Sequence, residues 1–144
     1  MRFVNNLTSD DAGEGAAAVC PDATDFVVLC LCAEWCGTCR EYRNEFERLA
    51  SDSPEVKFLW WDIEDNAERM GDLDVENFPT ILVFRRQWIL FFGTMLPQIR
   101  HLQRLLETFQ GQTLEQSRDY ASSSPERRSW QANPDLAELA CFAQ

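Results

Sequence analysis

The chain has 144 residues, a formal net charge of -11 and an apolar share of 45%. A length of this order is typical of one domain with its own core, and the apolar share is too high for a disordered chain. The negative charge disfavours nucleic acid and anionic membranes as partners, because both would repel the chain at long range.

No stretch of the sequence predicts a membrane span. The longest apolar stretches, at residues 26–33 and 88–92, have the length of strands and not the ~20 residues that cross a bilayer. Residues 1–6 lack the apolar run of a secretory signal, so we expect a cytoplasmic protein. The chain has six cysteines but is too long and too apolar for a secreted disulfide scaffold. In a reducing compartment, a close cysteine pair is more often catalytic or metal-binding than structural.

The first half of the chain alternates strand and helix patterns. A weak strand pattern at residues 3–7 and a weak helix pattern at residues 8–18 precede a continuous apolar run at residues 26–32. Such a run is typical of a strand that is covered on both faces. After Cys36 the apolar spacing becomes helical, and Pro54 ends the predicted helix.

The second half predicts a mixed sheet. Three further strands are expected, at residues 56–63, 80–84 and 88–92. A short helix at residues 66–73 separates the first two, whereas a turn joins the last two, so we expect an α/β fold with helices on both faces. The last strong helix begins near Pro97 and ends at Gly111.

The end of the chain differs in composition from the rest. Residues 122–125 read Ser-Ser-Ser-Pro, which predicts a linker. Asn133 followed by Pro134 is typical of the start of a short terminal helix. We therefore expect a domain at residues 1–110 and a C-terminal extension at residues 111–144, made of a linker and a short helix.

The motif W-C-G-T-C at residues 35–39 lies between the predicted strand at residues 26–32 and a predicted helix. The positive end of a helix dipole favours thiolate, which makes Cys36 the candidate nucleophile. Cys39 follows within one helical turn as the candidate resolving thiol. Half of a metal site or two buried thiols are the alternatives, and the flanking strand and helix favour redox chemistry over both.

Several segments together resemble the thioredoxin family: A-E-W-C-G-T-C-R at 33–40, D-I-E-D-N at 62–66, F-P-T at 78–80, Gly93 and the helix after Pro97. The resemblance covers about residues 1–110. It implies a thioredoxin fold, with a central mixed β-sheet flanked by helices on both faces. It also implies a thiol–disulfide oxidoreductase that exchanges or reduces protein disulfides through a Cys36/Cys39 dithiol.

The resemblance also implies a set of substrate-binding residues: Trp35, Gly37, Thr38, Phe78, Pro79 and Gly93. Pro79 would be a cis proline facing the Cys36–Cys39 disulfide, and the backbone of Phe78 would pair with an extended substrate. Trp35 would offer an apolar surface to partners. The expected reductant is a reductase of the thioredoxin-reductase type or another thiol donor, with no bound cofactor and no metal.

The sequence departs from the family at the buried proton-handling pair. Cys30 stands where thioredoxins usually have an aspartate, and Trp60 stands where a lysine often pairs with it. Cys30 and Cys32 leave the same face of the predicted strand, so both are expected near the active site. They are buried apolar fillers, or Cys30 pairs with Cys39, or the four cysteines hold a soft metal such as zinc.

A rival function is a non-catalytic adaptor, in which a thioredoxin fold serves for partner binding or assembly. The absent aspartate and the additional C-terminal segment keep this alternative open, because a fold alone does not determine a function.

Overall fold

The structure is a computed structural model that describes residues 25–33, 36–65, 68, 75 and 77–143. The strand predicted at residues 3–7 and the helix predicted at residues 8–18 lie outside the described residues, as does nearly all of the helix predicted at residues 66–73. Within the described residues no helix has both the length and the hydropathy of a bilayer span.

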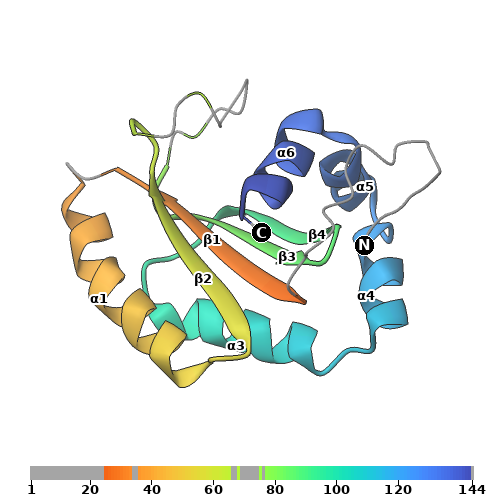
Figure 1. The fold of residues 1–144 in the computed structure, drawn as a ribbon, viewed down its shortest axis with the longest axis horizontal. Helices are drawn as coiled ribbons and strands as arrows, with labels where there is room; N and C mark the ends of the chain where they lie inside the picture. Colours follow the sequence, from red (N-terminus) through yellow and green to blue (C-terminus); the bar gives the residue numbers. More distant parts are fainter. Residues whose placement is uncertain (1–24, 34–35, 66–67, 69–74, 76, 144) are drawn as a thin grey trace.

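The described residues form a central sheet of four strands (Figure 1). Its strands are β1 (Phe26–Cys32), β2 (Val56–Asp62), β3 (Thr80–Arg85) and β4 (Trp88–Thr94). They lie in the order β2-β1-β3-β4, with β1 and β2 parallel and the other neighbours antiparallel. The predicted mixed sheet is therefore confirmed.

Strand β1 is central because it is apolar on both faces. All seven of its residues are buried. Alternate side chains belong to two separate core clusters, with Val28 and Cys30 in one and Val27 and Leu29 in the other. A strand of this kind is stable only where other elements cover both faces.

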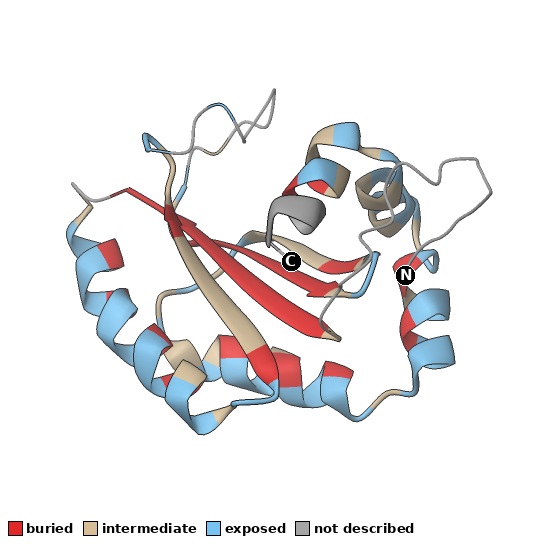
Figure 2. Cartoon of the chain, viewed as in Figure 1, coloured by how far each residue is buried: buried red, intermediate tan, exposed pale blue. Residues whose placement is uncertain are grey.

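Two helices cover the first face of the sheet, α1 (Gly37–Asp52) and α3 (Ile99–Gln110). Each turns one stripe of side chains inward and leaves polar residues outside, as the burial colours show (Figure 2). The inner stripes consist of Cys39, Tyr42, Phe46 and Leu49 on α1, and of Leu102, Leu106 and Phe109 on α3.

Three helices follow where we expected a linker and one helix: α4 (Leu114–Ala121), α5 (Pro125–Ala132) and α6 (Pro134–Ala143). The serine-rich segment is a tight turn and not a linker, because Ser124 caps α5 by accepting a hydrogen bond from the Arg127 N–H. Thr113 and Gln116 form a reciprocal capping box that starts α4. The predicted terminal helix is confirmed as α6.

Two of these helices contribute to the core on the second face of the sheet. Leu136 and Leu139 of α6 are buried in the cluster that contains Val27 and Leu29, and Trp130 of α5 packs against it. The Gln131 side chain of α5 bonds the backbone of β4 directly. Its amide accepts from the Ile89 N–H at 3.0 Å and donates to the Ile89 carbonyl at 2.6 Å.

Arg85 at the end of β3 ties the sheet to the start of α4. Its guanidinium donates to the Gln112 carbonyl at 3.0 Å, to the Ser117 hydroxyl at 2.9 Å and to the Asp25 carboxylate at 3.2 Å. The Arg85 side chain is only 12% exposed, so these bonds are largely shielded from water. The chain beyond residue 110 is thus joined to the sheet by polar contacts as well as by its apolar core.

We predict that Leu139→Ala lowers the free energy of unfolding by about 2–5 kcal/mol, the usual cost of truncating a buried leucine. Leu139 is fully buried against the sheet. Denaturant unfolding measures the loss, with Glu138→Ala on the exposed side of α6 as the matched control. Equal stability of the two variants would show that α6 does not belong to the cooperative core.

Candidate active site

Helix α1 directs Cys39 into the core of the protein. Cys39 is 1% exposed and lies on the same inner stripe as Tyr42 and Phe46. Because this stripe faces the sheet, the Cys39 sulfur points toward β1 and away from solvent.

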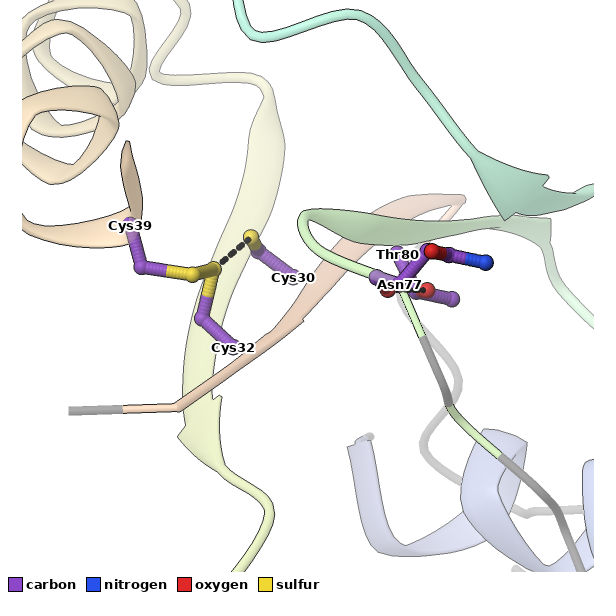
Figure 3. The surroundings of a disulfide bond; sticks show 5 residues. All are labelled: Cys30, Cys32, Cys39, Asn77 and Thr80. Carbon is purple, nitrogen blue, oxygen red and sulfur yellow. Dashed lines mark hydrogen bonds between the residues drawn. A yellow bond between two sulfur atoms is a disulfide. The ribbon is translucent and has the colours of Figure 1, made fainter. Parts of the chain in front are cut away.

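Cys32 ends β1 on the face that α1 covers. It belongs to the same core cluster as Cys39 and is also 1% exposed. A disulfide joins Cys32 to Cys39, whose Cα atoms are 5.9 Å apart (Figure 3). The structure therefore pairs Cys39 with Cys32, and not with Cys36 as the sequence led us to expect.

Cys36 is a free thiol at the N-cap of α1. Its N–H donates to the Ala33 carbonyl at 3.0 Å, and its carbonyl accepts from the Arg40 N–H at 3.2 Å. The first bond joins Cys36 to the residue that follows β1, and the second belongs to the first turn of α1. Among the four cysteines whose side chains the structure describes, only Cys36 is not buried.

Cys30 lies directly behind the disulfide. It is fully buried, and its thiol donates to the Cys32 sulfur at 3.9 Å (Figure 3). Burial raises the pKa of Cys30 well above its usual value of 9.0, which keeps it a neutral thiol. The interpretation of Cys30 as a buried apolar filler is thus supported, whereas the same interpretation of Cys32 is wrong because Cys32 is bonded.

The structure shows neither of the two other arrangements that we considered for these cysteines, a Cys30–Cys39 disulfide and a metal site. Cys39 is bonded to Cys32, so the proposed Cys30–Cys39 disulfide is not formed. Within the described residues, no three His, Cys, Asp or Glu side chains are grouped as a metal site would require.

Trp60 is the neighbour of Cys30 across the β1–β2 ladder, as we expected from the sequence. Its ring packs against Phe46 with centroids 5.5 Å apart, and the Arg43 guanidinium lies 5.4 Å from the Trp60 ring centroid. Aromatic packing therefore occupies the position at which a lysine would have completed an acid–base pair.

Tyr42 is a second uncharged group beside Cys30. Its hydroxyl is buried without a hydrogen-bond partner among the described residues. Burial, followed by the proximity of Cys30 and Glu45, raises the pKa of Tyr42 and keeps the hydroxyl protonated. The core behind the disulfide thus consists of neutral thiol and aromatic groups.

A cavity of about 440 Å³ opens beside Cys39. It is lined by Ala33, Cys39, Arg40, Arg43, Trp60, Asp62 and Asp65. The Asp62 carboxylate accepts the Glu64 N–H at 2.8 Å, which holds the turn after β2 at the edge of this space. The residue pattern at 62–66 does not predict this cavity.

The expected cis bond is present between Phe78 and Pro79. Pro79 is buried at the start of β3, and its carbonyl accepts from the Met95 N–H at 3.1 Å. The Thr80 hydroxyl donates to the Asn77 carbonyl at 2.7 Å, which closes the turn before β3 (Figure 3). Phe78 is half-buried against the core cluster that Cys36 also contacts.

The remaining predicted substrate-binding residues occupy different parts of the structure. Gly37 and Thr38 are exposed in the first turn of α1, and Gly93 pairs with Ile81 within the sheet. Trp35 lies outside the described residues. Substrate binding by these residues stays a prediction.

Comparisons with known sequences place this chain beside thioredoxins and a protein disulfide-isomerase. The profile of the thioredoxin family, described as "Thioredoxin", matches residues 16–90. A putative thioredoxin 2 of Streptomyces coelicolor is 30% identical over 67 residues, which cover 46% of this chain and 50% of that protein. A protein disulfide-isomerase of Medicago sativa is 37% identical over 67 residues, which cover 42% of this chain and 13% of that protein. The chain thus spans half or less of the length of these relatives.

A solved structure resembles the chain as well. Thioredoxin from Trypanosoma brucei brucei superposes with a TM-score of 0.57 at 24% identity, covering 62% of this chain and 79% of that one. This likeness concerns the fold, and with the strand order it confirms the expected thioredoxin fold. Since the family profile also matches more than half of its residues, the chain belongs to the thioredoxin family.

Proposed function

We propose that this chain is a thiol–disulfide oxidoreductase that reduces or exchanges disulfides of other proteins. One observation carries the proposal: a free, half-exposed thiol at the start of α1, Cys36, adjoins a buried cysteine pair in which Cys39 is already bonded. A protein substrate cannot reach the sulfurs of residues that are only 1% exposed, as Cys32 and Cys39 are, so exchange with a partner has to begin at Cys36.

The reaction runs in two steps from the form in which Cys36 and Cys39 are both reduced. The Cys36 thiolate attacks a substrate disulfide, forms a mixed disulfide and releases one substrate thiol. The Cys39 thiolate then attacks the Cys36 sulfur, releases the second substrate thiol and leaves a Cys36–Cys39 disulfide. Two electrons pass to the substrate, and the dithiol itself carries them.

The cycle requires a thiol donor that returns two electrons to the oxidised site. A reductase of the thioredoxin-reductase type or another dithiol would meet this need. We also propose a cytoplasmic location, because a reducing compartment keeps a half-exposed thiol such as Cys36 free. No feature of the described residues favours the adaptor alternative over this chemistry.

We predict that the wild-type protein accelerates insulin reduction by dithiothreitol and that Cys36→Ser loses this acceleration. The serine hydroxyl is not a nucleophile toward disulfides at neutral pH, so the entry point for electrons is removed. Turbidity of the precipitating insulin chains measures the rate, and dithiothreitol alone gives the baseline. Equal rates for the wild type and the variant would contradict the proposal and favour the adaptor.

A trapping experiment tests the order of the two cysteines. We predict that Cys39→Ser accumulates mixed disulfides with substrate proteins, because the variant lacks the thiol that resolves the bond at Cys36. Non-reducing gels and mass spectrometry detect the adducts. The double variant Cys36→Ser/Cys39→Ser is the matched control, and equal trapping by both variants would assign the attack to another cysteine.

We further predict that iodoacetamide modifies Cys36 but not Cys30 in the native protein at any pH up to about 9, the usual thiol range. Only thiolate reacts, and burial holds the pKa of Cys30 above that range. After labelling, the Cys32–Cys39 disulfide is reduced and all remaining thiols are labelled with N-ethylmaleimide. Cleavage after Asp25, Glu34 and Glu41 then yields peptides 26–34 and 35–41, in which the carbamidomethyl group reports Cys30 and Cys36, respectively. Urea-unfolded protein should react at both, and equal native rates would contradict the assigned burial.

A further inference from the structure

Cys32 has no place in the two-cysteine cycle, yet it holds the bond to Cys39. We propose that the site is a three-cysteine relay, in which Cys39 passes its disulfide from Cys36 at the surface to Cys32 in the core. The inference rests on the proposed function, in which Cys36 exchanges disulfides with other proteins. It adds Cys32 as a third redox-active residue.

The positions of the three sulfurs support a shared bond. Cys36 is the N-cap of α1 and Cys39 lies in its first turn, which is the C-x-x-C spacing at which redox-active thiol pairs form a disulfide. Cys32 and Cys39 have a Cα separation of 5.9 Å, which lies within the normal range for a disulfide. Cys39 can therefore bond either partner while the strand and the helix keep their places.

Open space beside Cys39 allows the change of partner. The cavity of about 440 Å³ is bordered by Cys39 and by Ala33, which follows Cys32 in the chain. A well-packed core resists side-chain rotation, whereas a side chain that borders a cavity has room to adopt another rotamer. The Cys39 side chain borders such a space even though it is buried.

The migration is an isomerisation and needs no oxidant. The Cys32 thiolate attacks the Cys39 sulfur of a Cys36–Cys39 disulfide, so the Cys32–Cys39 bond forms and Cys36 leaves as a thiolate. Cys36 takes up a proton from water, which replaces the proton that Cys32 lost. The Cys30 thiol, 3.9 Å from the Cys32 sulfur, takes no part in these bond changes.

The relay changes how the oxidised protein is reduced. A disulfide between two cysteines that are each 1% exposed is inaccessible to an external thiol until Cys36 attacks Cys39 and the bond returns to Cys36. Its reduction should therefore follow the rate of migration. The Cys32–Cys39 disulfide thus stores two oxidising equivalents that are released only after attack by Cys36 of the same chain.

Peptide mapping of the full chain detects the two disulfides separately. Oxidation of the reduced protein by oxidised glutathione is stopped with acid at intervals, free thiols are alkylated, and the chain is cleaved after Asp25, Glu34 and Glu41. A Cys36–Cys39 disulfide leaves peptide 35–41 unlinked and unalkylated, with a mass two hydrogens below that of the reduced, unlabelled peptide. A Cys32–Cys39 disulfide links peptide 35–41 to peptide 26–34.

In the wild type we expect single oxidised peptide 35–41 first and the linked pair later. Cys32→Ala should lose the linked pair and stop at the first form, whereas Cys30→Ala is the matched control that removes an equally buried thiol and keeps the link. Cys36→Ser should form the linked pair far more slowly than the wild type. A wild type without the linked pair, or a Cys36→Ser that forms it as fast, would overturn the relay.

A kinetic measurement provides a second readout. The rate at which dithiothreitol reduces the oxidised wild type should reach a plateau as the thiol concentration rises, because migration becomes limiting. In Cys32→Ala it should stay proportional to the thiol concentration. Proportional rates in both proteins would overturn the relay even if both fold equally well, as circular dichroism would verify.

The insulin assay separates the failure of the relay from the failure of the proposed function. Insulin reduction that depends on Cys36 without any linked pair would overturn the relay and leave the oxidoreductase in place. A linked pair that forms through Cys36 without insulin reduction would support the relay and contradict the proposed function.

Discussion

The packing of α1 on one face of β1 determines which cysteines of this protein meet. Cys39 shares the inner stripe of the helix with Tyr42 and Phe46, and Cys32 shares its strand face with Cys30. Burial of the two faces stabilises this register by roughly 25 cal/mol per Å² of apolar area removed from water. Because each residue turns a helix by about 100°, a shift of one position would carry the Cys39 sulfur away from the sheet.

Sequence patterns predicted most of the described framework. Strand β1 runs over the predicted residues 26–32, since a short, unbroken apolar run is typical of a strand that is buried on both faces. Helix α1 follows its apolar spacing and ends two residues before Pro54. The cis bond at Pro79 followed from the family resemblance alone, because cis prolines are too rare to expect from local sequence.

The partner of Cys39 could not be predicted from the motif. Closeness in sequence favoured Cys36, but Cys39 lies on the inner stripe of a helix and Cys32 on the covered face of a strand. The sequence showed the helical and the strand periodicity separately. Only the packing of the helix on the strand shows that the Cys32 and Cys39 sulfurs meet. The polar segment at residues 122–125 misled for a different reason, because serine and proline mark helix starts as well as linkers.

The surroundings of Cys30 explain why the missing aspartate matters. Cys30, Trp60 and Tyr42 form a neutral layer behind the disulfide, and a charge placed there would lose its hydration without gaining a partner. In the reaction that we propose, protons would therefore come from the side of Cys36 or from the cavity at Cys39, which Arg40 and Asp62 border.

The contact between Gln131 and Ile89 has a consequence for the behaviour of the whole molecule. Among the described strands β4 is an outer one, and such strands offer backbone groups with which another chain can pair. The Gln131 amide fills both the donor and the acceptor of Ile89, as an added strand would. The C-terminal helices thereby protect the protein against edge-to-edge aggregation at this position.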